Sequence, residues 1–146
     1  MSAETLSYRT HLDVSAAEAF RWHARPGALE RLTPPWEPVQ VLERTGNSIT
    51  DGSRVTLGIR LGPLRWRWVS EHSGYRQDEQ FRDVQLSGPF ARWEHTHRFE
   101  PDGASACYLE DRIVYALPLG VLAQRCGGVF VRRKLERLFA YRHCIT

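Results

Sequence analysis

Between Val39 and Leu117 apolar residues recur at every second position, in short runs separated by turn-forming residues. A repeat of two is typical of strands with one buried face, and clusters of Gly, Pro, Asn and Asp mark the turns that join them. In the clearest run, Arg54–Leu61, valine, leucine and isoleucine alternate with arginine, threonine and glycine. The segment therefore predicts six consecutive antiparallel strands, each with one face buried and the other in solvent.

A pair of tryptophans follows this run. If Gly62–Pro63 forms the connecting turn, Trp66 faces Ile59 and Trp68 faces Leu57. The neighbouring arginines point to the opposite side of the strand, so tryptophans and arginines cannot form one surface that stacks bases and binds phosphates. We therefore expect core aromatic residues beneath a solvated basic face, and no nucleic-acid binding.

Helical signals follow an additional strand at the beginning of the chain. Residues 5–12 alternate as a strand does, and Ser15–Glu18 has the spacing of a helix capping box. The helix that begins there should be interrupted at Pro26–Gly27. Residues 28–32 can form a second short helix before Pro34–Pro35 ends it.

The last part of the chain returns to a helical repeat. Val131, Leu135, Leu138 and Phe139 fall on one face of a helix, and basic residues lie largely elsewhere around its axis. Gly127–Gly128 should weaken the middle of this helix by about 1 kcal/mol per glycine, and should mark a bend or a close approach.

These elements predict an α+β fold, in which a curved seven-stranded antiparallel sheet surrounds a long C-terminal helix and two short helices follow the first strand. The 146 residues, of which 42% are hydrophobic, suit a single domain over residues 1–146 with a sizeable core. Where sheet and helix diverge, we expect a cavity lined by aromatic and aliphatic side chains, which is the expected place for a ligand.

The charge and cysteine content give no strong support for nucleic-acid binding, a disulfide framework or a zinc knuckle. The net charge is only +3, and the 20 basic residues, among which Lys134 is the single lysine, are dispersed among 17 acidic ones. Cys107, Cys126 and Cys144 are far apart and form no Cys-x-x-Cys pair, so we expect reduced thiols rather than disulfides or a zinc knuckle. No export signal or membrane-length apolar run is present, which predicts a cytoplasmic protein without membrane insertion.

The strongest candidates for chemistry lie on the strand that contains Trp93, His95, His97 and Phe99, because the pleat places all four on one face. Their shared aromatic character predicts that this face is the inner one. Both histidines should then be buried.

Two aspartates on neighbouring strands complete this set. A hairpin centred near Gly103 would place Asp111 opposite His95, and a turn over Ser87–Ala91 would place Asp83 on the other side of the same histidine. The sequence thus predicts an Asp83–His95–Asp111 rung across three strands. A register slip of one residue would move Asp83 to the solvent face.

Four interpretations of these residues stay open. The rung can satisfy buried polar groups and fix the strand register, or it can orient a ligand. His95 with a neighbouring aspartate is chemically suited to acid/base catalysis, but no activated nucleophile is identifiable beside it. Two histidines and an aspartate are thin support for a metal site, so we expect neither a metal ion nor another cofactor.

Several motifs in one order resemble a bacterial branch of the SRPBCC superfamily, whose members are also described as START-like or Bet v 1-like helix-grip proteins. Similar domains occur alone or ahead of a sugar-nucleotide-epimerase-like domain. The resemblance spans nearly the whole chain and is carried by Arg25-Pro26-Gly27-Ala28, Arg31-Leu32-Thr33-Pro34-Pro35-Trp36, Phe81-Arg82-Asp83-Val84-Gln85, Gly88-Pro89-Phe90, Trp93-Glu94-His95-Thr96-His97-Arg98-Phe99, Asp111, Tyr115-Ala116-Leu117-Pro118 and Phe139-Ala140-Tyr141-Arg142.

The resemblance implies a helix-grip fold with a deep hydrophobic cavity, which the superfamily uses for lipids, sterols, plant hormones, polyketides and other apolar compounds. It favours a protein that binds an apolar or amphipathic small molecule over an enzyme. A polyketide cyclase or aromatase that uses the inner His/Asp cluster is the first alternative, and a macromolecular interaction module that uses the arginine-rich outer surface is the second.

The candidate ligand-binding residues combine apolar wall positions with the polar set described above. An exposed sheet edge could also pair two copies of the chain into a homodimer. The candidates are Trp66, Trp68, Phe81, Asp83, Trp93, His95, His97, Asp111, Ile113 and Tyr115.

Overall fold

The computed structural model describes residues 3–37, 39–46, 49–61, 63–118 and 120–146, except for the side chains of residues 61 and 120–126. The turn residue Gly62 and the side chain of Cys126, on which two of the expectations above depend, lie outside this description. The strands are β1 (Glu4–Leu12), β2 (Val39–Thr45), β3 (Arg54–Leu61), β4 (Leu64–Arg76), β5 (Gln80–Ser87), β6 (Arg92–Pro101) and β7 (Cys107–Ala116), and the helices are α1 (Ala16–Ala24), α2 (Ala28–Leu32) and α3 (Gly120–Ile145).

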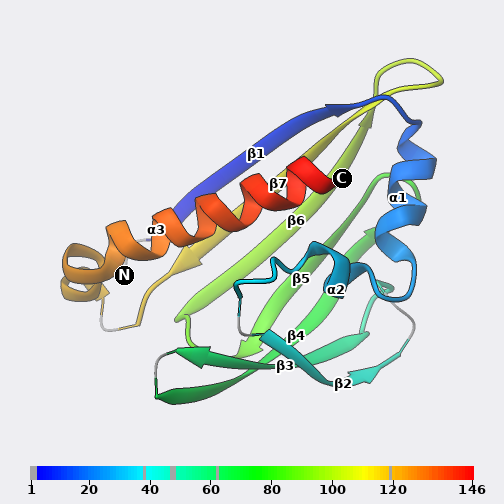
Figure 1. Ribbon diagram of the computed structural model, residues 1–146. Coiled ribbons are helices and arrows are strands. Elements are labelled where there is room, and N and C mark those ends of the chain that lie inside the picture. Colours follow the sequence, from blue (N-terminus) through cyan, green and yellow to red (C-terminus); the bar gives the residue numbers. More distant parts are fainter. Residues whose placement is uncertain (1–2, 38, 47–48, 62, 119) are drawn as a thin grey trace.

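The seven strands form one antiparallel sheet in the order β1-β7-β6-β5-β4-β3-β2. The sheet curves, and α3 lies across its concave face alongside β1, β7 and β6, while α1 and α2 lie near the end of the sheet where α3 finishes (Figure 1). The predicted α+β architecture, a helix gripped by a seven-stranded sheet, is therefore confirmed. None of the helices in the described part of the chain is long and apolar enough to cross a membrane.

The two short helices begin as the sequence indicates. Ser15 caps α1, because its Oγ accepts a hydrogen bond from the backbone N–H of Glu18 at 3.2 Å. Gly27 precedes α2 with a φ of 82°, a backbone conformation that side chains with a Cβ rarely adopt. This reversal lets α2 turn back after α1.

The observed register agrees with the predicted one between β3 and β4 and between β5 and β6, and it differs between β6 and β7. Ile59 pairs with Trp66 and Leu57 with Trp68, as predicted. Asp83 pairs with His95, also as predicted. The predicted pairing of His95 with Asp111 is wrong, because the β6–β7 register is displaced by two residues.

In the observed register, His97 lies opposite Asp111 and His95 opposite Ile113. A displacement of two residues keeps every side chain on its predicted face, since side-chain direction in a strand repeats every two residues. The loop that joins the strands is centred on Ala104, one residue later than predicted: β6 ends at Pro101 and β7 begins at Cys107, and these two residues pair. The polar residues therefore remain on the inner face, but they do not form a single straight rung.

The inner face carries two separate apolar clusters. The first surrounds Phe20 of α1 and includes Leu12, Phe81, Phe99 and Leu109. The second is pressed against α3 and consists of Leu6, Trp93, Ile113, Tyr115, Leu135 and Phe139. Leu135 and Phe139 are buried, which confirms the predicted apolar stripe of the last helix.

The glycine pair in α3 does not produce the predicted close approach at Gly127. The assigned helix continues from Gly120 to Ile145. Outside the neighbouring backbone of the helix itself, a Cβ built on Gly127 would meet no atom of the described residues within 4 Å. Packing among the described residues therefore does not require a glycine at this position.

Gly127→Ala should raise the free energy of unfolding by up to about 1 kcal/mol, because alanine restricts the unfolded chain and favours helix. Urea denaturation followed by circular dichroism would measure the change. A loss of stability would show that the glycine is required by a contact of α3 that the added methyl group disrupts.

Candidate functional site

A polar layer separates the two apolar clusters on the inner face. Along β6, Trp93 belongs to the cluster at α3 and Phe99 to the cluster at α1, and His95 and His97 lie between them. Both imidazoles are buried, with centroids 3.8 Å apart. Because β1, β6 and β7 each run from one cluster to the other, their middle residues meet in this layer.

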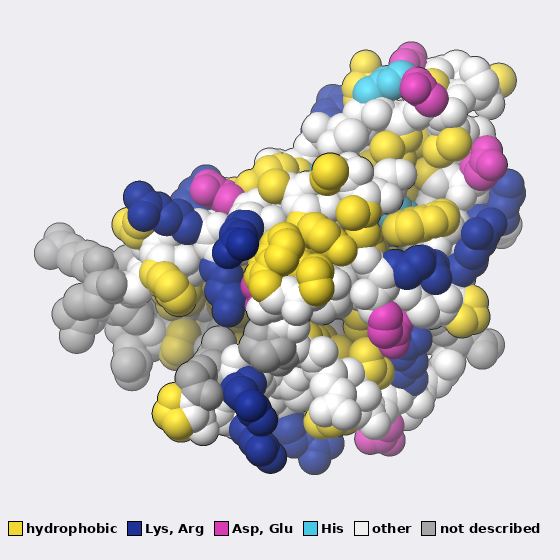
Figure 2. All heavy atoms as spheres, in the orientation of Figure 1, with side chains coloured by type: hydrophobic (Ala, Val, Ile, Leu, Met, Phe, Trp, Pro, Cys, Tyr) yellow, Lys and Arg dark blue, Asp and Glu magenta, His cyan; other side chains and the backbone are white. Residues whose placement is uncertain are grey.

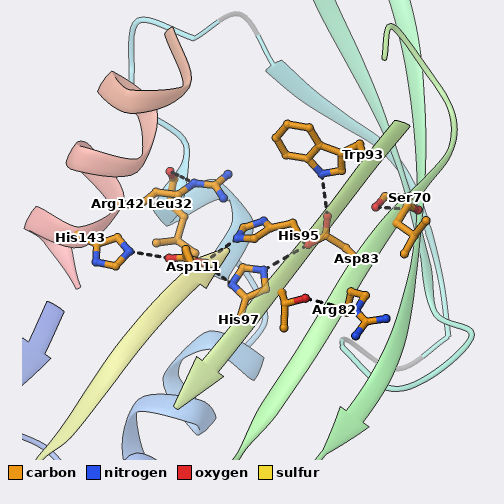
Figure 3. A network of polar contacts seen from close by, with 12 residues as sticks. Leu32, Ser70, Arg82, Asp83, Trp93, His95, His97, Asp111, Arg142 and His143 are labelled. Carbon is orange, nitrogen blue, oxygen red and sulfur yellow. Dashed lines mark hydrogen bonds and ion pairs between the residues drawn. The ribbon is translucent and has the colours of Figure 1, made fainter. Parts of the chain in front are cut away.

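Asp111 of β7 is the centre of the layer (Figure 3). The Nε2–H of His95 donates to Asp111 Oδ1 at 2.6 Å, and Nδ1 of His97 lies 2.9 Å from the same oxygen. The second oxygen, Oδ2, accepts from Nε2 of His143 at 2.7 Å. One buried carboxylate therefore contacts three imidazoles.

Asp83 of β5 faces the other side of the two adjacent histidines. Its Oδ2 accepts a hydrogen bond from Nε2 of His97 at 3.2 Å and lies 3.5 Å from Nδ1 of His95. Its Oδ1 accepts from the indole Nε1–H of Trp93 at 3.4 Å. The Asp83 side chain is 20% exposed, against 5% for Asp111, so the layer opens to solvent at Asp83.

The pKa values of His95 and His97 are shifted in opposite directions. Burial alone would lower the pKa of His97, but Asp111 and Asp83 outweigh it and raise that pKa to about 9. Burial and the neighbouring His97 lower the pKa of His95, despite both aspartates. Burial also opposes ionisation of both aspartates, yet the surrounding imidazoles hold their pKa values below the usual range. Without further ligands, the layer is an ion-pair network in which His97 carries the positive charge.

Three contributors to this network were not predicted from the sequence. His143 of α3 joins Asp111 to Thr10 of β1, whose Oγ1 lies 2.5 Å from His143 Nδ1. Arg142 donates from Nε to the carbonyl of Leu32 at 3.2 Å, and this guanidinium also lies near Asp111. Helical spacing could have predicted the two contributors from α3. Arg142 and His143 lie three and four residues after Phe139, and residues at this spacing share one face of a helix.

Some of the residues that were predicted to line an apolar wall lie together in the structure. Trp68, Phe90 and Trp93 pack edge-on or tilted against one another, with ring centroids 4.9–5.5 Å apart. Ile113 and Tyr115 are fully buried beneath them. Trp66 was predicted to line the inner wall, but it is 40% exposed. It pairs with Ile59 close to the end of the β3–β4 hairpin, and this hairpin lies beyond the part of the sheet that α3 covers (Figure 1).

Phe81 was also predicted as a wall residue, and it lies in the other apolar cluster. Its ring stacks on the imidazole of His97 with centroids 4.1 Å apart and planes inclined by 14°. It therefore covers the polar layer from the side of α1. Two hollows formed by the described residues lie on the outer face of the sheet, and neither is lined by a residue of the polar layer.

Some arginines of the outer face pair with carboxylates. Arg54 pairs with Glu71 at 2.8 Å and Arg92 with Glu94 at 2.9 Å. On the side that α3 covers, hydrophobic side chains gather in the middle and Lys and Arg side chains are spread around them (Figure 2).

A further buried histidine, His23 of α1, provides a test of this electrostatic description. Its Nδ1–H donates to the carbonyl of Ala19, and burial lowers its pKa from 6.5 to about 4. The unfolded chain therefore takes up this proton first as the pH falls. The stability that neutral His23 contributes is present above pH 6.5 and is lost as the pH falls through 4.

Between pH 7 and pH 4, the wild-type protein should lose about 3 kcal/mol more stability than His23→Phe, which cannot titrate at this position. Urea denaturation of both proteins at several pH values would measure this difference. Parallel curves for the two proteins would mean that His23 titrates in the folded protein as it does in the unfolded chain.

A comparison with models of protein families shows to which family the chain belongs. Residues 12–139 match the family model described as polyketide cyclase / dehydrase and lipid transport. The chain belongs to this family. The match covers most of the chain and confirms the SRPBCC relationship indicated by the sequence motifs. No curated protein matches the sequence closely enough to count as a relative.

Solved structures similar to this family member share its fold at low sequence identity. An aromatase/cyclase from a Streptomyces species aligns with a TM-score of 0.75 and 14% identity, over 97% of this chain and 90% of that chain. A point mutant of norcoclaurine synthase from Thalictrum flavum, in complex with a transition-state analogue, aligns with a TM-score of 0.73 and 12% identity, over 95% of this chain and 90% of that chain. A nucleoside-diphosphate sugar epimerase from Corynebacterium glutamicum aligns with a TM-score of 0.63 and 25% identity, over 74% of this chain and 24% of that chain.

Proposed function

We propose that the protein binds an apolar or amphipathic small molecule between the concave face of the sheet and α3, with the polar group of the ligand at Asp83. The observation that carries this proposal is the polar layer, which lies between two apolar clusters and opens to solvent at one carboxylate. Pockets for small molecules combine apolar walls with a few placed polar groups. The family description, which includes lipid transport, supports a ligand of this kind.

The polar layer is costly if its only role is structural. Two carboxylates and three imidazoles have been removed from water, and such groups are often replaceable by apolar side chains without loss of stability. Every buried side-chain nitrogen and oxygen in the described residues has a hydrogen-bond partner. A satisfied and rigid network of this kind can hold Asp83 in one orientation toward a ligand.

The apolar part of the ligand would lie against the aromatic side chains next to Asp83. Trp93 connects the two regions, because its ring contacts Trp68 and Phe90 while its indole N–H donates to Asp83. Trp68 and Phe90 are only half-buried, so they can move apart at less cost than the fully buried Ile113 and Tyr115. Ligand entry on the side of Trp68 and Phe90 therefore requires the least rearrangement.

The five tryptophan indoles supply built-in reporters for this proposal. We would titrate 15N-labelled protein with 2-naphthol, an aromatic compound with one hydroxyl group, and record the indole N–H resonances. The resonances of Trp68 and Trp93 should shift, because one lines the proposed wall and the other donates to Asp83.

Trp22 is the matched control in the same spectrum, because it lies on α1 under the guanidinium of Arg31, away from the proposed wall. Its resonance should not move. Shifts confined to Trp22 or to the half-exposed Trp36 would contradict the proposal and would indicate binding at the surface.

A further inference from the structure

Three potential metal ligands converge where the polar layer meets solvent. One donor atom from each of Asp83, His95 and His97 lies within 4.8 Å of the other two. Asp83 Oδ2 is 3.2 Å from Nε2 of His97 and 3.5 Å from Nδ1 of His95. Ligands at 2.0–2.1 Å from a tetrahedral zinc ion are separated by about 3.3 Å. The described distances therefore leave space for one ion of this size.

The hydrogen bonding of His95 determines which of its nitrogens faces Asp83. Its Nε2 is held by Asp111 Oδ1 at 2.6 Å, so Nδ1 is the nitrogen that faces the Asp83 carboxylate, at 3.5 Å from Oδ2. A divalent ion at this point would bind both atoms.

The outer atoms of all three groups are held by further hydrogen-bond partners. Asp111 Oδ1 contacts the distal nitrogens of both histidines, at 2.6 and 2.9 Å. Trp93 donates to Asp83 Oδ1, which leaves Oδ2 free to face the histidines. Metal-binding histidines almost always donate their second N–H to a carboxylate, a backbone carbonyl or water, which fixes the tautomer and the ring orientation. The layer has this arrangement.

We propose that Asp83 Oδ2, His95 Nδ1 and His97 Nε2 bind one divalent transition-metal ion, with Asp111 as the carboxylate that positions both imidazoles. The ion replaces the proton on His97 Nε2 that is shared with Asp83, and this proton is released to solvent on binding. Two imidazoles and one carboxylate suit Zn²⁺, Fe²⁺ and Co²⁺ better than Mg²⁺ or Ca²⁺. Three protein ligands leave a coordination position open on the side of Asp83, where water or a ligand oxygen can bind. This proposal does not depend on the small molecule proposed above.

The test uses the intact, chelator-treated chain and two probes, Zn²⁺ and Co²⁺. Calorimetric titration with Zn²⁺ should give one ion per chain. Asp83→Asn should abolish this binding or weaken it by more than tenfold. Asp111→Asn should weaken it by about 10- to 100-fold, because its effect is exerted through the ligands.

The matched control is a surface His–Asp pair of the same chain. His11 Nε2 lies 2.9 Å from Asp102 Oδ2, and both side chains are 40% exposed or more. His11→Gln should leave Zn²⁺ affinity unchanged. Failure of wild type to bind Zn²⁺, or equal losses in His11→Gln and Asp83→Asn, would overturn the proposal.

X-ray absorption of the Zn²⁺-loaded wild-type protein keeps the proposal testable if the variants fail to fold. The spectrum should show two imidazole ligands with light-atom neighbours at about 2.0 Å, and the Co²⁺ form should show the visible bands of a low-coordinate site. A zinc spectrum without imidazole scattering would contradict the assignment. None of these outcomes depends on 2-naphthol binding, so metal binding and ligand binding can fail separately.

Discussion

Replacing Asp111 by alanine should lower the free energy of unfolding by about 3–5 kcal/mol, or prevent folding altogether. The carboxylate contacts His95, His97 and His143, and all three imidazoles lie in the buried layer. Its removal leaves the positive charge of His97 with Asp83 as the one remaining carboxylate beside it among the described residues. Breaking a buried ion pair by deleting one partner is strongly destabilising for this reason.

Asp102→Ala is the control for Asp111→Ala, because Asp102 also pairs with a histidine but is 52% exposed. It should change the free energy of unfolding by less than about 0.5 kcal/mol. Chemical denaturation of both variants at pH 7 would measure the difference. Similar small effects for the two aspartates would show that the buried layer is not the ion-pair network that the contacts indicate.

Phe139→Ala should cost about 3–5 kcal/mol, because it removes a fully buried aromatic ring and leaves a cavity under α3. The ring of Phe139 lies edge-on to His95 with centroids 5.0 Å apart and stacks on Tyr8 at 6.0 Å. It therefore connects the last helix to both the polar layer and β1.

Phe130→Ala is the matched control on the same helix, since Phe130 is 71% exposed. It should be close to neutral in the same urea denaturation experiment. Equal losses for the two phenylalanines would contradict the orientation of α3, and a neutral Phe139→Ala would mean that the helix does not pack on the sheet through this ring.

Much of the fold was predictable because it depends on repeats in the sequence. The repeat of two from Val39 to Leu117 determines which side of each strand is buried, and the stripe containing Leu135 and Phe139 determines which side of α3 meets the sheet. A register error of two residues leaves each side chain on its predicted face of the sheet. The prediction therefore placed four polar residues together correctly although one pairing was wrong: Asp83, His95, His97 and Asp111.

The remaining details depend on where a loop is centred and on segments that are distant in the sequence. The centre of the β6–β7 loop, Ala104 rather than Gly103, determines which histidine lies opposite Asp111, and turn-forming residues alone do not determine that centre. His143 reaches Asp111 from a helix 32 positions away in the sequence, and Trp66 is exposed because the gripping helix does not cover it. Contacts of this kind are set by tertiary packing.

The central claim is that the buried polar layer recognises the polar group of an apolar ligand through Asp83. The most direct measurement compares the affinities of 2-naphthol and naphthalene for the chelator-treated protein, followed by tryptophan fluorescence. Wild type should bind 2-naphthol at least about tenfold more tightly, because a hydrogen bond to a charged group contributes about 1.5–3 kcal/mol. In Asp83→Asn the difference should shrink markedly. Equal affinities in the wild-type protein, or a preference for 2-naphthol that Asp83→Asn leaves intact, would contradict the assignment of Asp83 as the polar contact.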